Sequence, residues 1–153
     1  MRRRALLASA AAVSTASLAG CPTPPWSDAA VRFDGAEVTF RREHTGQFDP
    51  ADSDRLGGVE LRTEFDREPP RLLIRGFAMG GVQECYQVSL IDAERSAERL
   101  SVEVAVEQRP FVSACNDAGE GHPYEVGISF TEAPVPNRVV VRHGGEPMLE
   151  ADV

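Results

Sequence analysis

The chain of 153 residues contains no lysine, so all 16 of its basic residues are arginines. They are outnumbered by 24 aspartates and glutamates, and no stretch of the sequence forms a basic patch. Binding to nucleic acid draws on clustered positive charge that neutralises phosphates. We therefore expect no nucleic acid among the partners of this protein.

The common motifs of catalysis and cofactor binding are missing as well. The segment Gly127-Ile128-Ser129-Phe130-Thr131 lacks the second glycine of a nucleophile elbow. The glycines of 76–81 precede neither a helix pattern nor a lysine, so a phosphate-binding loop is not indicated. Metal-pair spacing on one element is absent for all three histidines: His44, His122 and His143. The sequence predicts no enzyme, no cofactor and no metal site. Because there are 24 acidic residues, the sequence alone does not test whether two of them form a catalytic acid/base pair.

One acidic stretch is the best candidate for a cation ligand. Carboxylates cluster at Asp49, Asp52 and Asp54, as calcium prefers. The helix-loop-helix calcium template fails, because Leu56 takes a ligand position and Thr63 stands where a bidentate glutamate belongs. We expect a solvated acidic loop here.

The chain also lacks an apolar run of the length of about 20 residues that spans a bilayer. Its longest apolar and small-residue run, 5–20, follows three arginines and ends in Leu18-Ala19-Gly20-Cys21. A charged start, an apolar middle and a small-residue cleavage site are typical of a secretory signal. The alternative, a transmembrane anchor, fits the short run less well.

Leu18-Ala19-Gly20-Cys21 resembles the lipobox of a lipoprotein signal peptide, and Arg3-Arg4-Ala5-Leu6-Leu7 resembles a twin-arginine export signal. The resemblance implies that 1–20 is a lipoprotein signal peptide and that Cys21 becomes a lipid-bearing N-terminus. It places the protein on the extracellular face of the cell membrane, held by lipid on Cys21. Residues 21–30 then form a tether, in which Pro22-Thr23-Pro24-Pro25 favours an extended spacer.

Without residues 1–20 the chain has 13 arginines against 24 acids, a net charge of −11. An acidic chain without lysine resembles the proteins of salt-loving archaea. An ordinary acidic protein from a GC-rich genome is the alternative. In molar salt the screening length is about 3 Å, so repulsion between surface carboxylates is suppressed.

From residue 31 onward, apolar and polar residues alternate between frequent turn signals, which predicts an all-β domain. The clearest case is 100–107, where valines and a leucine alternate with serine, alanine and glutamates. Similar patterns lie at 36–41, 59–65, 71–78, 86–90, 124–130 and 139–141. About seven short strands predict an immunoglobulin-like antiparallel β-sandwich over 31–145, with a small closed barrel as the alternative and 146–153 as a C-terminal tail.

Three cysteines are present, and lipid on Cys21 leaves Cys85 and Cys115 as a pair in an exported protein. We predict a structural disulfide between them. A redox or metal pair is less favoured, because Cys-x-x-Cys spacing is absent. The pair also departs from the immunoglobulin pattern, since no tryptophan lies between the two cysteines.

Taken together, residues 31–145 resemble the small disulfide-stapled β-sandwich domains of uncharacterised lipoproteins from halophilic archaea. The features that carry the resemblance are the lipobox, the Cys85/Cys115 pair and the segment 136–143. These families have no assigned activity, so the resemblance implies a fold and a location but no catalytic residues.

We predict a non-catalytic binding or interaction module whose partner is an unknown protein or other extracellular ligand. Loops at the end of a sandwich are common recognition sites. The candidate binding-loop residues are Phe77, Met79, Asn116 and His122, with His122 and His143 expected at the surface. The alternatives are a structural accessory subunit of an envelope complex and a small metal-dependent hydrolase.

The charge balance predicts how stability responds to salt. The melting temperature of the protein should rise strongly between low and molar potassium chloride, because self-repulsion of the acidic surface is screened. Thermal unfolding followed by circular dichroism measures this response, and a flat profile would refute the salt-adapted interpretation.

Overall fold

The computed structural model describes residues 29–46 and 58–153, and these residues form nine β-strands. Within these ranges, no helix of a length and apolarity suited to crossing a membrane is found. The strands are β1 (Ala29–Phe33), β2 (Ala36–Arg41), β3 (Val59–Glu64), β4 (Arg71–Gly81), β5 (Tyr86–Ser96), β6 (Arg99–Gln108), β7 (Gly119–Phe130), β8 (Arg138–His143) and β9 (Glu146–Asp152).

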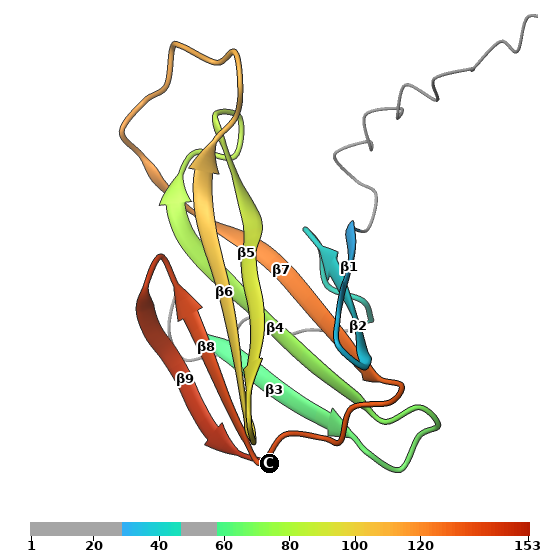
Figure 1. Ribbon diagram of the computed structural model, residues 1–153. Coiled ribbons are helices and arrows are strands. Elements are labelled where there is room, and N and C mark those ends of the chain that lie inside the picture. Colours follow the sequence, from blue (N-terminus) through green and yellow to red (C-terminus); the bar gives the residue numbers. More distant parts are fainter. Residues whose placement is uncertain (1–28, 47–57) are drawn as a thin grey trace, which may run out of the picture.

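The strands form two sheets. One sheet has the order β1-β2-β7-β4-β3 and the other the order β5-β6-β8-β9. Figure 1 shows β5, β6, β8 and β9 in front of β3, β4 and β7, and the buried side chains of both layers form one cluster. The predicted all-β sandwich is therefore confirmed at the level of two packed sheets.

The core lies between the two sheets, where the predicted alternation places the apolar residues. On β6, Leu100, Val102 and Val104 are fully buried, whereas the residues between them are only partly covered. Full burial of one aliphatic side chain is worth about 1.5–3 kcal/mol. The opposite sheet contributes Val38, Phe40, Leu72, Ile74, Val126 and Ile128.

One strand pair differs from the predicted antiparallel arrangement. β6 and β8 pair in parallel, with Leu100 opposite Val139 and Val102 opposite Val141. The reason is connectivity: after β6 the chain crosses to the other sheet as β7 and then returns, so β8 enters from the same end as β6. The four-stranded sheet is thus mixed.

The strand count also differs from the expected seven. β1 begins at Ala29, before the expected start of the domain, and residues 146–152 form β9 where the sequence predicts a tail. β9 completes a hairpin with β8, with Val141 opposite Leu149. β5 and β6 form a hairpin, in which β5 ends at Ser96 and β6 begins at Arg99.

The turn between β1 and β2 is bonded to the connection between β7 and β8. Gly35 has a φ of 74°, and its carbonyl accepts bonds from the backbone N–H groups of Thr131, Glu132 and Ala133 at 3.0, 3.0 and 2.8 Å. A Cβ at this position would lie 2.4 Å from the nitrogen of Ala133. A side chain at position 35 is therefore opposed both by the left-handed backbone and by lack of space.

These two effects can be separated by comparing Gly35→Ala with Gly144→Ala. Gly144 also has a positive φ, 56°, but nothing lies within 4 Å of the point that a Cβ would occupy there. Gly144→Ala should lower the free energy of unfolding by about 1–2 kcal/mol, the cost of a left-handed non-glycine residue. Gly35→Ala should cost at least about twice that. Denaturant unfolding in molar salt measures both, and equal losses would contradict the packing described here.

Candidate functional site

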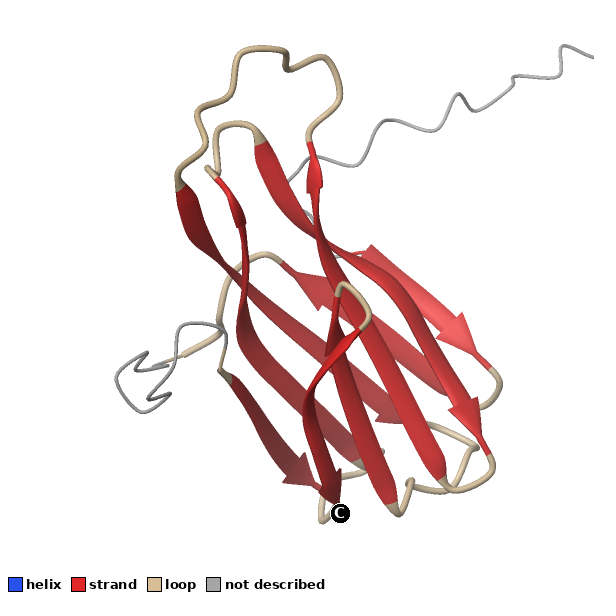
Figure 2. Cartoon of the chain, turned by 90° about the vertical axis from the view of Figure 1, so that its left-hand side faces the viewer, coloured by secondary structure: helices blue, strands red, loops and turns tan. Residues whose placement is uncertain are grey.

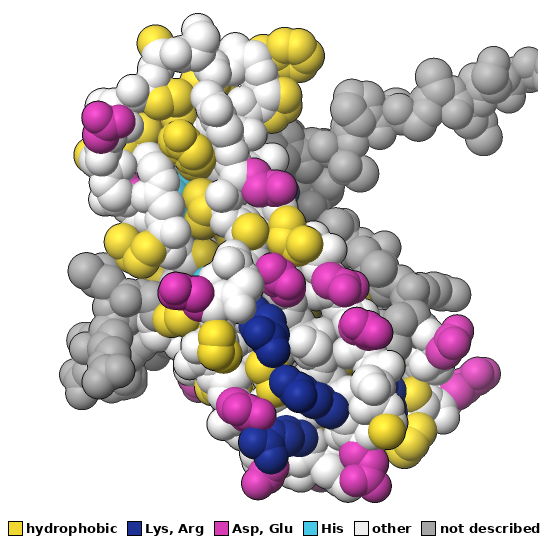
Figure 3. Space-filling view, turned by 60° about the vertical axis from the view of Figure 1, so that its left-hand side comes forward, with side chains coloured by type: hydrophobic (Ala, Val, Ile, Leu, Met, Phe, Trp, Pro, Cys, Tyr) yellow, Lys and Arg dark blue, Asp and Glu magenta, His cyan; other side chains and the backbone are white. Residues whose placement is uncertain are grey.

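A cavity among the described residues, here called the side pocket, lies at one side of the sandwich between the two sheets. It has a volume of about 530 Å³. Figure 3 shows one face of the molecule, and histidine atoms are visible between hydrophobic side chains in the upper part of that face. The lining residues come from the end of β4, from β5 and β6, from the segment before β7 and from the β8–β9 turn: 78–81, Tyr86, 105–106, 116–119 and 143–144.

Two adjacent glycines let the walls of the side pocket approach each other. A Cβ on Gly80 would lie 2.3 Å from Cγ1 of Val106, and one on Gly81 would lie 2.3 Å from Cδ2 of Tyr86. The backbone of β4 therefore runs directly against the facing side chains. Any larger residue at these two positions would displace β6 or the tyrosine ring.

A tyrosine–histidine pair lies beside the side pocket. The hydroxyl of Tyr124, which is fully buried, is 2.7 Å from Nε2 of His143, and the two rings meet edge to face with centroids 5.4 Å apart. Burial raises the pKa of Tyr124 and lowers the pKa of His143. Both groups are therefore neutral at neutral pH, the tyrosine hydroxyl donates a hydrogen bond to Nε2 of His143, and Nδ1 carries the single ring proton.

The side pocket contains two of the four predicted binding-loop residues. Met79 and Asn116 both line it, although they are far apart in the sequence. Phe77 instead packs edge to face against His44, with ring centroids 5.0 Å apart. His122 lines a different, smaller cavity. The four predicted binding-loop residues therefore do not lie together at one site.

The prediction that His122 lies on a surface loop is wrong. β7 begins at Gly119, so His122 is a strand residue opposite Ala78, and only 3% of its surface is exposed. Its Nε2 is 2.6 Å from the carbonyl oxygen of Gly81. His143, also expected to be exposed, is partly buried because its ring packs on Tyr124.

A disulfide fixes one wall of the side pocket. The segment 109–118 between β6 and β7, here called the tip loop, is joined to the β4–β5 turn by the bond between Cys85 and Cys115, whose Cα atoms are 5.9 Å apart. The predicted disulfide is therefore confirmed. It closes a 30-residue separation, and such a crosslink stabilises a fold by about 3–4 kcal/mol in the chain-entropy model.

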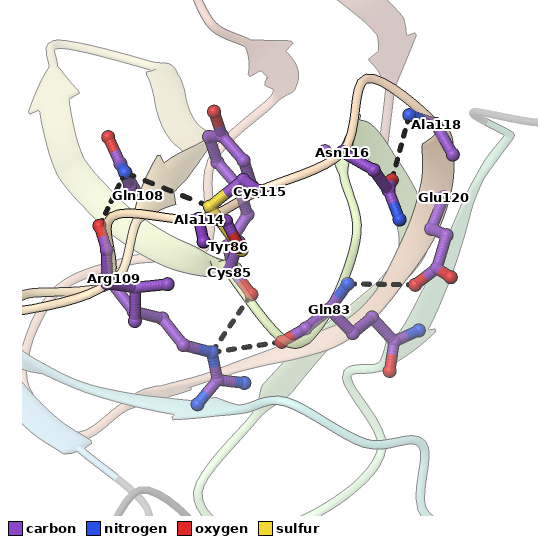
Figure 4. The surroundings of a disulfide bond; sticks show 12 residues. Gln83, Cys85, Tyr86, Gln108, Arg109, Ala114, Cys115, Asn116, Ala118 and Glu120 are labelled. Atoms are coloured by element: carbon purple, nitrogen blue, oxygen red, sulfur yellow. Dashed lines mark hydrogen bonds between the residues drawn. A yellow bond between two sulfur atoms is a disulfide. The ribbon is translucent and has the colours of Figure 1, made fainter.

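Hydrogen bonds support the same junction, as Figure 4 shows. Nε of Arg109 donates to the carbonyl oxygens of Gln83 and Tyr86 at 3.0 and 3.1 Å. Gln108 donates from Nε2 to the carbonyl oxygen of Val112 at 2.9 Å, and Oδ1 of Asn116 accepts from the N–H of Ala118 at 3.0 Å. The tip loop is therefore held at both ends.

The smaller cavity, about 90 Å³, lies near the β4–β5 turn and holds two arginines, Arg42 and Arg109. Nε of Arg42 donates to the carbonyl oxygen of Val88 at 2.8 Å, which links the end of β2 to β5. Burial, followed by the positive charge of Arg109, lowers the pKa of Arg42. Both arginines bind backbone carbonyls here, which indicates a structural role.

A buried carboxylate lies on the outer face of the five-stranded sheet. Only 3% of Glu125 is exposed, and its Oε2 accepts from Nε of Arg75 at 2.8 Å and from the N–H of Thr45 at 3.1 Å. Burial raises the pKa of Glu125, but the bonds from Thr45 and Arg75 outweigh burial and the pKa is lowered overall. This ionised group fixes the segment after β2 to β7. Period-two alternation predicts its outward direction but not its partners.

Metal ligands are not gathered anywhere in the part of the chain that the structure describes, since no three of its His, Cys, Asp and Glu side chains come together as a ligand set. The acidic positions Asp49, Asp52 and Asp54 lie outside the described residues, as do Cys21 and the tether up to residue 28.

The lowered pKa of His143 predicts a pH dependence of stability. The ordinary pKa of histidine is about 6.5. When the pH drops below this value, the unfolded chain takes up a proton at His143 that the folded chain resists, so the free energy of unfolding decreases as the pH decreases. His143→Gln should lose part of the difference in unfolding free energy between pH 7.5 and 5.5. Tyr124→Phe keeps the buried imidazole and should keep that difference. An unchanged pH dependence in His143→Gln would contradict the burial described here.

Comparisons with family models, with curated proteins and with solved structures found no match to this chain. The assignment of function therefore depends on the geometry of the sandwich, the side pocket and the tip loop.

Proposed function

We propose that this protein is a lipid-anchored extracellular lipoprotein whose sandwich domain binds a ligand, without catalysis, in the side pocket. The observation that carries the proposal is the side pocket itself. Its volume of about 530 Å³ is within the 300–1,000 Å³ typical of ligand sites. The disulfide and the glycine pair hold its walls in place, so the site is formed before the ligand arrives.

The lining indicates the class of ligand. Ala78, Val106 and the ring of Tyr86 give the side pocket an apolar wall, and Asn116 and His143 add polar groups. Among the lining residues only Asp117 carries a charge at neutral pH, because His143 is neutral. An uncharged or singly cationic ligand with an apolar part fits this lining. An anionic ligand would be repelled by the carboxylate of Asp117, and none of the described residues that line the side pocket carries a positive charge to compensate for it.

The chemistry of the tyrosine–histidine pair supports binding rather than catalysis. A tyrosine with a raised pKa holds its proton, so its hydroxyl is a poor nucleophile and a poor general base at neutral pH. The hydrogen bond to Nε2 occupies that proton in the free protein. The pair can instead orient the ring of His143 at the edge of the side pocket.

Location and fold family form part of the same proposal. The lipobox and the tether support attachment to the outer face of a membrane, and the acidic, lysine-free composition supports a salt-rich habitat. Two packed sheets with their core between them support an immunoglobulin-like sandwich. Its parallel β6–β8 pair is then a departure from the purely antiparallel arrangement.

Photo-crosslinking in intact cells tests the binding role. A photoreactive phenylalanine analogue at Ala118, in the lining, should form an adduct in molar salt that the same analogue at Ala114 does not form. Ala114 is an exposed residue of the same loop but lies outside the lining. Ala118→Trp should abolish ligand capture, since the ring fills the cavity, whereas Ala114→Trp should leave it unchanged. Identical adducts from both positions would overturn the proposal.

A further inference from the structure

The side chain of Phe111 is wholly exposed to solvent, although phenylalanine is among the most apolar residues. Its backbone is also unfavourable, with a φ of 66°, in a region that bulky side chains rarely adopt. Both features cost free energy in the isolated domain. Backbone outliers of this kind cluster at functional sites, where the surrounding structure holds them in place.

The base of the tip loop holds Phe111 away from the domain. The disulfide lies on one side of it, and the N–H of Arg109 donates to the carbonyl oxygen of Cys85 at 2.7 Å on the other. Figure 2 shows the tip loop projecting beyond the strands at the upper end of the sandwich. The disulfide and this hydrogen bond therefore fix the base of the loop on which the ring of Phe111 is exposed.

The N-terminal end of β1 points toward the end of the sandwich that carries the tip loop. β1 and β7 are both antiparallel to β2, so they run in the same direction, and following either strand backward leads toward the tip loop. Ala29 lies level with Phe40 and Val126, and Gly119, where the tip loop ends, is seven residues nearer that end. At about 3.3 Å per residue this is roughly 23 Å.

The tether has a matching reach. Ala29 lies eight positions after Cys21, which corresponds to at most about 26–29 Å of extended chain. Cys21 can therefore reach the level of Gly119, at the base of the tip loop that carries Phe111. A tether of this length leaves the domain little room to stand far from the bilayer.

The charge of the tip loop suits a lipid surface. From Pro110 to Asn116 the loop contains no charged residue, in a chain that is otherwise strongly acidic. Charged side chains gather in the lower part of the face shown in Figure 3, and the upper end is largely hydrophobic or uncharged. This is the part of that face which a bilayer would repel least.

We propose that Phe111 inserts into the membrane interface and acts as a second anchor beside the lipid on Cys21. The inference rests on the proposed lipid attachment. A single lipid chain holds a protein only marginally, and stable attachment needs a second contribution. Burial of the exposed phenylalanine ring in lipid supplies such a contribution and fixes the orientation of the domain, with the tip loop toward the bilayer.

Fluorescence of the lipidated full chain on vesicles tests this orientation. Trp26, the only tryptophan, is replaced by Phe, and a single tryptophan is then introduced by Phe111→Trp or, as the control, by Met148→Trp on β9. The vesicles contain phosphatidylcholine brominated on its acyl chains, in molar potassium chloride. Emission from position 111 should be quenched and shifted to the blue, and emission from position 148 should not. Protein bound to vesicles without quenching at position 111 would overturn the inference.

A glycine at position 111 removes both the aromatic ring and the unfavourable backbone conformation, so it distinguishes an effect on membrane binding from an effect on folding. Glycine adopts a positive φ readily, so Phe111→Gly should unfold at the same or a higher temperature than the wild type. Its partition into unbrominated vesicles should fall about tenfold to a hundredfold, whereas Met148→Ala should partition as the wild type does. Equal partition of Phe111→Gly and wild type would also overturn the inference.

Cys21→Ser distinguishes this inference from the location on which it rests. If the wild type binds vesicles and Cys21→Ser does not, the lipid attachment holds and the quenching at position 111 decides the role of Phe111. If the wild type and Cys21→Ser bind equally poorly and neither carries lipid, the proposed location is wrong and the second anchor fails with it. Capture of a side-pocket ligand at position 118 is independent of both results.

Discussion

The bond between Cys85 and Cys115 is the constraint on which the functional features of this molecule depend. It joins two connections, the β4–β5 turn and the tip loop, each of which links one sheet to the other. One side of that junction forms a wall of the side pocket, and the other supports the exposed ring of Phe111. This crosslink is therefore a covalent restraint on both the side pocket and the tip loop.

The strands are largely predictable from the sequence, because alternation of apolar and polar residues reports directly on one buried face. Leu100, Val102 and Val104 are buried as their spacing predicts. β9 escapes such a prediction because Glu146, Pro147 and Met148 show neither alternation nor strand preference, and its pairing with β8 supplies the missing stabilisation. The parallel β6–β8 pair is not predictable either, since strand adjacency depends on how the sheets pack rather than on local pattern.

The side pocket is predictable only in fragments. Turn signals mark Met79 and Asn116 as loop residues, which is wrong for Met79, a residue of β4, and the meeting of the two depends on the register of β4 and β7. The pair of Tyr124 and His143 escapes prediction, because a tyrosine on a core-facing position gives no sign of its hydrogen-bond partner. The one available signal is the pair Gly80-Gly81, whose meaning as a close approach to β6 and Tyr86 emerges only in three dimensions.

The placement of β9 at the edge of its sheet, as the described residues form it, has a consequence for aggregation. An unprotected edge strand invites another copy to add on and extend the sheet. Here the edge carries Glu146, Glu150 and Asp152, whose mutual repulsion between copies weakens as ionic strength rises. Pro147 lacks an amide hydrogen at every salt concentration. In concentrated brine, Pro147 therefore still interrupts edge-to-edge hydrogen bonding after the repulsion between the acidic side chains has been screened.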